Sequence, residues 1–122
     1  MILADTSIWA DHFDRRKRTL AGLLAREEVL GHPFVTAELA LGNLADWSDT
    51  VAMLELLPQA RVARPTELMI LIEQEKLQGS GIGFVDAHLL ASCRLSGALL
   101  WTRDKRLVAQ AERLDCSWST GA

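Results

Sequence analysis

The stretch from Gly79 to Leu107 limits most strongly what this chain can fold into. A loop rich in glycine leads into an apolar segment with helical spacing, and Gly97 ends that segment. Residues 98–101 are a short apolar run typical of a buried strand, and Asp104 follows shortly after it. We therefore expect a loop, a helix and a buried strand in immediate succession.

Asp86 is the unusual residue of this stretch. On a helix it shares a face with the residues three, four and seven positions later, which are Leu89, Leu90 and Cys93. These apolar neighbours predict a buried face, where a carboxylate is costly unless something pairs with it. Asp86 is therefore either an acid that favours the positive end of the helix or part of a polar cavity that holds a cation.

The composition is that of an ordinary globular protein. The chain has 122 residues, 49% hydrophobic and 24% charged, and we expect a single domain over residues 1–122. The net charge of −3 argues against a generally basic surface that coats nucleic acid. Cys93 and Cys116 show no metal or redox spacing, and neither a signal peptide nor an apolar run near the ~20 residues of a membrane span is visible. We therefore expect a cytoplasmic protein.

Short apolar runs alternate with helical patterns along the chain. We expect strands at residues 1–4, 34–35 and 98–101, with weaker strand candidates at 61–63 and 115–118. The apolar spacing predicts helices after Ser7, at 20–28, after Thr36, at 48–57 and 65–78, from about Asp86 to the stop at Gly97, and at 105–114, with Ser7 and Thr36 as N-caps. This alternation predicts an α/β fold, a parallel sheet covered by helices on both faces.

Four acids fall where such a sheet forms its sites. Asp5 ends the first strand, Glu38 lies in the first helical turn after the second, and Asp104 follows the strand at 98–101. Asp86 begins the helix that leads to that same strand. Because sites in parallel sheets form at the carboxyl ends of the strands, the topology can bring all four to one edge. Crowded carboxylates repel one another, and Mg²⁺ or Mn²⁺ would resolve that conflict.

Each acid also has a structural alternative. Asp5 and Asp104 suit the caps of the helices that follow them, because a carboxylate accepts the free N–H groups of a first turn. Glu38 suits a surface position, and Asp86 suits a partner of the helix dipole. The position of each acid alone does not decide between these roles.

A basic run follows the first predicted helix and consists of Arg15, Arg16, Lys17 and Arg18. It is either a solvated entrance to the next helix or a patch that contacts phosphate. The same two alternatives hold for Arg103 and Lys105, which flank Asp104.

The acids and their neighbours resemble the ordered motifs of the PIN-domain ribonucleases. The four segments are Ile2-Leu-Ala-Asp5-Thr-Ser7, Thr36-Ala-Glu38-Leu, Gly83-Phe-Val-Asp86-Ala-His-Leu-Leu-Ala-Ser and Leu100-Trp-Thr102-Arg-Asp104-Lys-Arg-Leu. The resemblance in order, spacing and total length spans essentially the whole chain. Their order and spacing are most similar to the VapC group, the toxins of VapBC toxin–antitoxin pairs.

The resemblance implies a three-layer α/β/α PIN-like domain with a four- or five-stranded parallel sheet. It implies an endoribonuclease that depends on Mg²⁺ or Mn²⁺ and cleaves structured cellular RNA, such as tRNA or rRNA, by attack of metal-activated water on the phosphodiester. One or two ions would be held by Asp5, Glu38, Asp86 and Asp104. The expected partners are a VapB-like antitoxin that covers the acidic site and a second copy of the chain in a homodimer.

The resemblance also assigns roles to hydroxyl groups. Thr6, Ser7 and Thr102 are expected to orient the acids or the nearby backbone. The basic run Arg15 to Arg18 matches none of the motifs, so its contact with RNA is a hypothesis from charge alone.

Two other functions are alternatives to the nuclease. A catalytically silent PIN-like binding module would use its acids only to receive basic side chains of a partner, and the presence of all four acids favours the enzyme. A receiver-type phosphoacceptor needs an adjacent acidic pair after the first strand, whereas here Asp5 is followed by Thr6.

Overall fold

The computed structural model of the protein describes residues 1–120, and the last two residues of the predicted domain, 121 and 122, lie outside the described part. Strand β1 (Ile2–Ala4) lies between β2 (Val29–Leu30) and β3 (Leu99–Trp101), and both pairings are parallel. All three residues of β1 are buried. A short strand with both faces buried therefore forms the centre of the sheet, as its sequence predicts.

The sheet has three strands within residues 1–120, fewer than the predicted four or five. At the β2 edge, a single bridge joins Gly31 to Gln59. The strand predicted at 61–63 does not form. Its backbone N–H at Arg61 donates instead to the hydroxyl of Ser96, at 2.9 Å. The chain thus leaves the edge of the sheet after one pair.

The other edge ends in the same way. The strand predicted at 115–118 is reduced to a single parallel bridge between Leu100 and Ser117. On either side of that bridge, Leu100 exchanges backbone hydrogen bonds with Cys116 and Trp118. The predicted segment therefore lies beside β3, as expected, but is too short to count as a strand.

The second strand is not at 34–35. Pro33 begins helix α3 (Pro33–Ala40), so residues 34 and 35 are helical, and the N-cap is His32 and not Thr36. Proline favours the first position of a helix because it lacks the N–H that would be unpaired there and its φ is already helical. Glu38 consequently lies in the second turn of α3 and not in its first.

The helix predicted at 20–28 is shorter than expected. Helix α2 spans Ala21–Ala25, and Glu27 has a positive φ of 57° that turns the chain into β2. Helices α1 (Thr6–Phe13), α4 (Trp47–Leu56), α6 (Phe84–Ser96) and α7 (Lys105–Arg113) lie close to their predicted positions. Helix α5 (Pro65–Gln74) ends four residues before the predicted position 78, and Lys76 beyond it has a positive φ of 54°. Gly97 ends α6 in the left-handed conformation (φ 63°), which glycine adopts without strain.

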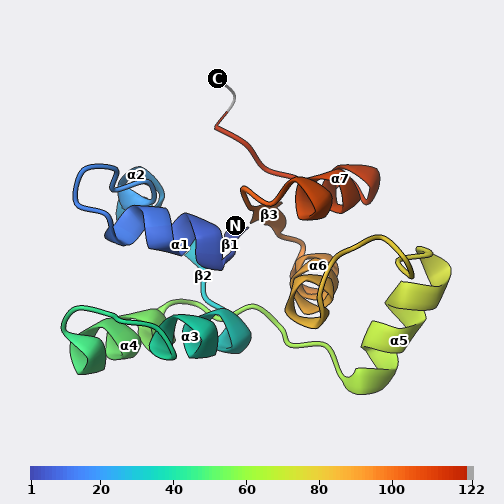
Figure 1. The fold of residues 1–122 in the computed structure, drawn as a ribbon, viewed down its shortest axis with the longest axis horizontal. Helices are drawn as coiled ribbons and strands as arrows, with labels where there is room; N and C mark the ends of the chain where they lie inside the picture. Colours follow the sequence, from blue (N-terminus) through green and yellow to red (C-terminus); the bar gives the residue numbers. More distant parts are fainter. Residues whose placement is uncertain (121–122) are drawn as a thin grey trace.

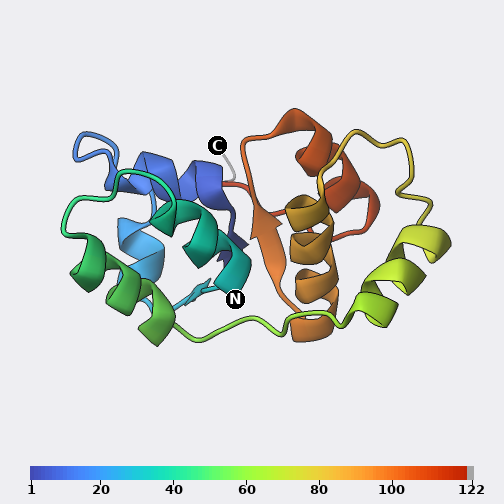
Figure 2. The ribbon, with the colours of Figure 1, turned by 60° about the horizontal axis from the view of Figure 1, so that its bottom comes forward.

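The helices cover the sheet on both sides. Figure 1 shows α1 and α2 on one side of β1 and β2, with α3 and α4 on the opposite side. In Figure 2, α6 lies along β3 and α5 lies at the outer end of the molecule beside α6. Such a three-layer α/β/α arrangement is what right-handed crossovers between parallel strands produce. None of the helices in residues 1–120 is long and apolar enough to cross a membrane.

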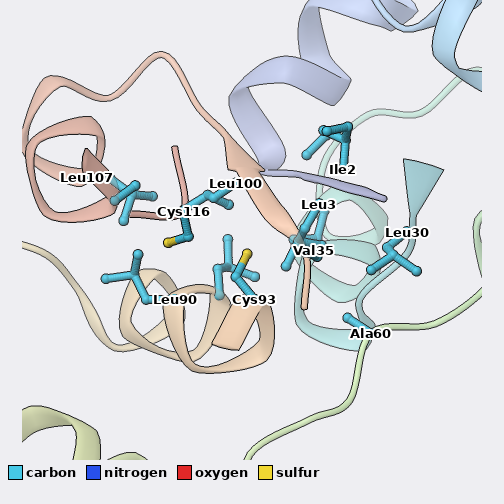
Figure 3. Packing of buried hydrophobic residues seen from close by; sticks show 14 of the residues in the cluster. Ile2, Leu3, Leu30, Val35, Ala60, Leu90, Cys93, Leu100, Leu107 and Cys116 are labelled. Carbon is cyan, nitrogen blue, oxygen red and sulfur yellow. The ribbon is translucent and has the colours of Figure 1, made fainter. Parts of the chain in front are cut away.

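A single hydrophobic core fixes the strands against the helices. Figure 3 shows Leu3 and Leu100 of the sheet surrounded by side chains of α3 and α6, including Val35 and Leu90. Each of these four is at most 2% exposed. Burial of a side chain of this size stabilises the fold by about 1.5–3 kcal/mol. The core therefore holds the carboxyl ends of β1 and β3 in a fixed relation, and the acids follow those ends.

Candidate functional site

Asp5 follows β1 directly and is the most buried of the four acids, with 7% of its surface exposed. Its Oδ1 accepts hydrogen bonds from the hydroxyl of Ser7, at 2.5 Å, and from the backbone N–H of Ile8, at 3.2 Å. Its Oδ2 accepts the hydroxyl of Thr102. Asp5, and not Ser7, is the N-cap of α1. The cap and the site acid are thus the same residue, and Ser7 lies inside the helix where it orients that acid.

Thr102 ties the ends of two neighbouring strands together. It follows β3 and is buried, and its hydroxyl donates to Asp5. The same hydroxyl accepts the backbone N–H of Asp104 at 3.0 Å. Asp104 in turn caps α7, because its Oδ1 accepts the backbone N–H of Leu107 at 3.0 Å. One threonine therefore positions two of the four acids.

Glu38 reaches the site from α3. The hydroxyl of Thr6, in the first turn of α1, donates to Oε1 of Glu38 at 2.8 Å. Glu38 is exposed, so this hydrogen bond sets its direction towards α1. The structure places all three predicted hydroxyl residues against acids: Thr6 on Glu38, and Ser7 and Thr102 on Asp5.

Asp86 lies in the first turn of α6 and is half-buried. Burial raises its pKa above the usual aspartate value, whereas the backbone N–H of Gly83, 3.4 Å from Oδ2, lowers it. Three further carboxylates also raise the pKa, namely those of Asp104, Asp5 and Glu38. The four acids come from four different elements, and the fold brings them close enough for their charges to repel.

The free carboxylate oxygens suit a hard divalent cation. Glu38, Asp86 and Asp104 each keep one oxygen that accepts no hydrogen bond from residues 1–120, and Oδ2 of Asp5 accepts only one. Carboxylate oxygens are the ligands that Mg²⁺ and Mn²⁺ prefer, so the donor chemistry fits. In the described part of the chain, however, no three His, Cys, Asp or Glu side chains lie close enough to bind one ion together. A bound ion would therefore have to draw the carboxylates inwards.

Another carboxylate, which is not one of the four site acids, forms ion pairs with two cations near the site. Asp11 on α1 pairs with Arg103, at 2.9 Å, and with Lys17, at 3.3 Å. Arg103 is the neighbour of Asp104, so Lys17 of the basic run reaches the vicinity of the site. Arg16 instead pairs with Asp14, at 3.5 Å. The two cations are exposed, with side chains 57% and 54% accessible for Arg103 and Lys17, whereas Asp11 is only 13% accessible. The cations can therefore contact a phosphate group from the solvent side while they remain paired with Asp11.

The other basic residues of the run at 15–18 and beside Asp104 are also exposed. Arg15, Arg18 and Lys105 form no ion pair within residues 1–120. They are available to a charged ligand, and nothing in the structure favours a particular one.

One contact near the site was missed by the sequence analysis. The side chain of Arg106, in the first turn of α7, lies across Gly81 in the loop before α6. A Cβ at Gly81 would lie 2.8 Å from Cδ of Arg106, and the φ of Gly81 is +86°. The positive φ is what requires glycine here, because the Arg106 side chain can shift but the backbone conformation cannot. No sequence pattern links these two residues, because packing alone brings α7 onto that loop.

The family follows from comparison with known proteins. The PIN domain matches residues 2–113, which is nearly the whole chain. The chain belongs to the PIN-domain family. This PIN-domain protein is also 44% identical over 110 residues to proteins named Ribonuclease VapC32 from two strains of Mycobacterium tuberculosis, CDC 1551 and H37Rv, with 89% of each chain covered. The predicted membership of the VapC group is thereby confirmed.

A solved structure supports the fold of this PIN-domain protein. The crystal structure of PAE2754 from Pyrobaculum aerophilum superposes with a TM-score of 0.57, covering 93% of this chain and 85% of the other. The two sequences are 18% identical. At that identity the likeness concerns the fold, and it confirms the three-layer α/β/α prediction.

Proposed function

We propose that this PIN-domain protein is a metal-dependent endoribonuclease that acts as the toxin of a toxin–antitoxin pair. One observation carries the proposal: four acids from separate elements converge at one edge of the sheet, where burial and mutual repulsion raise the pKa of Asp86. The name Ribonuclease VapC32 of its 44% identical relatives supports ribonuclease as the reaction class.

The ligands of the cation would be Asp5, Glu38, Asp86 and Asp104. When bound, Mg²⁺ or Mn²⁺ supplies a positive charge that lowers the pKa of water and neutralises phosphate oxygens during in-line attack. The chain contributes the rigidity of the site. Three donors hold the carboxylate of Asp5 in one orientation, so its remaining acceptor capacity lies on Oδ2.

The pKa of Asp86 would fall when the cation binds. Its raised pKa comes first from burial and then from the neighbouring carboxylates, and a positive charge between those groups would reverse the repulsion. Thr102 would hold the carboxylate of Asp5 and the backbone of Asp104, which leaves the side chain of Asp104 able to move towards the cation. The hydroxyl groups thus supply preorganisation, and the acids supply charge.

The proposed substrate is structured cellular RNA, such as tRNA or rRNA. The exposed side chains of Arg103 and Lys17 support a nucleic-acid ligand, because they present positive charge to solvent next to the acidic edge. Direct contact between RNA and the run from Arg15 to Arg18 stays a prediction from charge.

The proposed partners are a VapB-like antitoxin and a second copy of the chain, in the cytoplasm. The relatives' membership of the VapC group supports the antitoxin. Large apolar side chains on the surface support protein partners in general, because water-exposed apolar area is costly: Leu41 is 88%, Leu56 85% and Met69 62% exposed.

The test is cleavage of total cellular RNA by purified, antitoxin-free protein with Mg²⁺ or Mn²⁺, followed by mapping of the new ends. We expect discrete cuts that disappear in EDTA and in Asp86→Asn. Asp49→Asn is the matched control, because Asp49 is an exposed acid in the first turn of α4, outside the acidic cluster. It should cut like the wild type.

Other outcomes would contradict the proposal. Cuts that persist in Asp86→Asn would show that the nuclease is a contaminant or that the site lies elsewhere. Binding of divalent metal without cleavage of any RNA would favour the catalytically silent binding module.

A further inference from the structure

Two phenylalanines form an exposed aromatic face beside the acidic edge. Phe34 is in the first turn of α3, and Phe84 is the first residue of α6. Their rings are stacked, with centroids 6.4 Å apart and an interplanar angle of 23°. Phe84 is 67% exposed and Phe34 is half-buried. Because the two rings are adjacent, they form a contiguous apolar patch and not a single exposed side chain, and such patches often mark contact surfaces.

The face is held from behind by two buried histidines. The ring of His88 stands nearly perpendicular to both phenylalanines, with centroids 4.8 Å from Phe34 and 4.7 Å from Phe84. His32 packs against Phe34 at 5.2 Å, and its Nδ1 accepts the backbone N–H of Phe34. Nε2 of His32 therefore carries the proton and donates to Ser92 at 3.0 Å. These contacts fix the direction of the two rings.

Neither histidine brings charge to the face. Burial lowers the pKa of His32 to about 4, with His88 as a second cause, and burial also lowers the pKa of His88. Both rings are therefore neutral at physiological pH. The face offers flat apolar surface and no cation for a phosphate group.

The position of this face relative to the acids suggests its ligand. Phe34 and Glu38 are four residues apart on α3 and so share one side of the helix, one turn from each other. Phe84 and Asp86 are two residues apart on α6, so their side chains point to different sides of that helix, and the stacking of Phe84 on Phe34 is what brings Phe84 to the side of Glu38. An RNA whose phosphate lies at the acids therefore has a neighbouring nucleotide within reach of the aromatic face.

We propose that Phe34 and Phe84 form a stacking site for a nucleobase next to the scissile phosphate. The proposal rests on the proposed function, because it takes RNA as the ligand of the acidic edge. The base is the part of the nucleotide that fits, since the face offers flat apolar surface and its two supporting histidines are neutral. Every base has a π-face, so stacking here tolerates different sequences and favours the larger purines.

The test measures RNA binding separately from cleavage. Asp86→Asn serves as the non-cleaving background, and fluorescence anisotropy follows fluorescein-labelled oligoadenylate and oligouridylate in Mg²⁺. We expect Phe84→Ala to weaken binding of oligoadenylate by about tenfold and to remove the preference for adenine over uracil. Phe84→Trp should restore both, and Phe84→Leu, which keeps apolar volume without a π-face, should not.

Met69→Ala provides the matched control. Met69 is 62% exposed on α5, so its replacement removes a similar exposed apolar side chain elsewhere. It should leave both affinities unchanged. Unchanged binding of both oligonucleotides by Phe84→Ala would overturn the inference. So would a change of oligomeric state in sedimentation with RNA binding unaltered, because the face would then be a protein interface.

The two proposals fail in different ways. If Phe84 controls base-selective binding but the wild type cuts no RNA, the stacking site stands and the nuclease proposal fails. If the wild type cuts RNA and Phe84→Ala binds and cuts equally well, the nuclease proposal stands and the stacking site fails.

Discussion

Thr102→Val gives the sharpest test of how the site is built. Valine keeps the shape of threonine and removes only the hydroxyl. That hydroxyl donates to Oδ2 of Asp5 and accepts the backbone N–H of Asp104. Thr102 and Asp5 are both 7% exposed, so water cannot readily replace the bond between them. The change therefore leaves a buried carboxylate one donor short.

The expected cost follows from these two bonds. A hydrogen bond to a charged group contributes about 1.5–3 kcal/mol, and a neutral one contributes about 1 kcal/mol. The N–H of Asp104 lies next to an exposed side chain and regains part of its bond from water. We therefore expect a loss of about 2–3 kcal/mol in the free energy of unfolding, which lowers the Tm by roughly 10 °C for a domain of this size.

Thermal and urea unfolding of purified protein in EDTA measure this loss. Thr102→Ser keeps the hydroxyl and serves as the control, with at most a small loss from the missing methyl group. A double-mutant cycle with Asp5→Asn should return a coupling of about 1–2 kcal/mol. Equal stability of the valine and serine variants, or a coupling near zero, would refute the idea that Thr102 fixes Asp5.

Three further predictions concern stability. Burial and neighbouring acids raise the pKa of Asp86, so ionisation of this group lowers the stability of the folded state. In EDTA, Asp86→Asn should therefore have a higher Tm than the wild type at pH values above the usual aspartate pKa, and the same Tm below it. Mg²⁺ should raise the Tm of the wild type only. Gly81→Ala should destabilise by about 1 kcal/mol or more, given its positive φ and the contact with Arg106, whereas Gly22→Ala inside α2 should stabilise by about 0.5–1 kcal/mol in urea unfolding. The pKa of His32 falls from 6.5 to about 4 on folding, so between these pH values the unfolded chain binds a proton at His32 and the folded chain does not. The Tm of the wild type should therefore drop as the pH falls from 6.5 to about 4. In His32→Asn the Tm should depend less on pH over the same range.

Local signals in the sequence were strong enough to predict several elements. The strand β1 and the end of α6 at Gly97 were predicted correctly because an apolar run and a glycine each carry a conformational preference of their own. The spacing of apolar residues predicted α7, and the acids after β1 and β3 were correctly placed at the carboxyl ends of those strands. Glu38 was assigned to the same edge from a strand at 34–35 that does not form. The ordered motifs around those acids predicted the PIN-domain family, which the match over residues 2–113 confirms.

The second strand shows where local signals fail. β2 contains only Val29 and Leu30, too few residues for a period-two pattern to be visible. The apolar pair at 34–35 resembled a strand equally well, and Pro33 decided in favour of a helix. The strand exists because pairing with β1 stabilises it, and pairing is a property of the folded chain.

The sequence by itself determined the residue types of the site and the order in which they occur. Only the tertiary structure decided their partners: Thr102 bonds to Asp5 across 97 positions, and Phe34 stacks on Phe84 between two helices. The physical reason is that helix and strand preferences act over a few neighbouring residues. Contacts between distant residues exist only after the core has packed and fixed the elements that carry them.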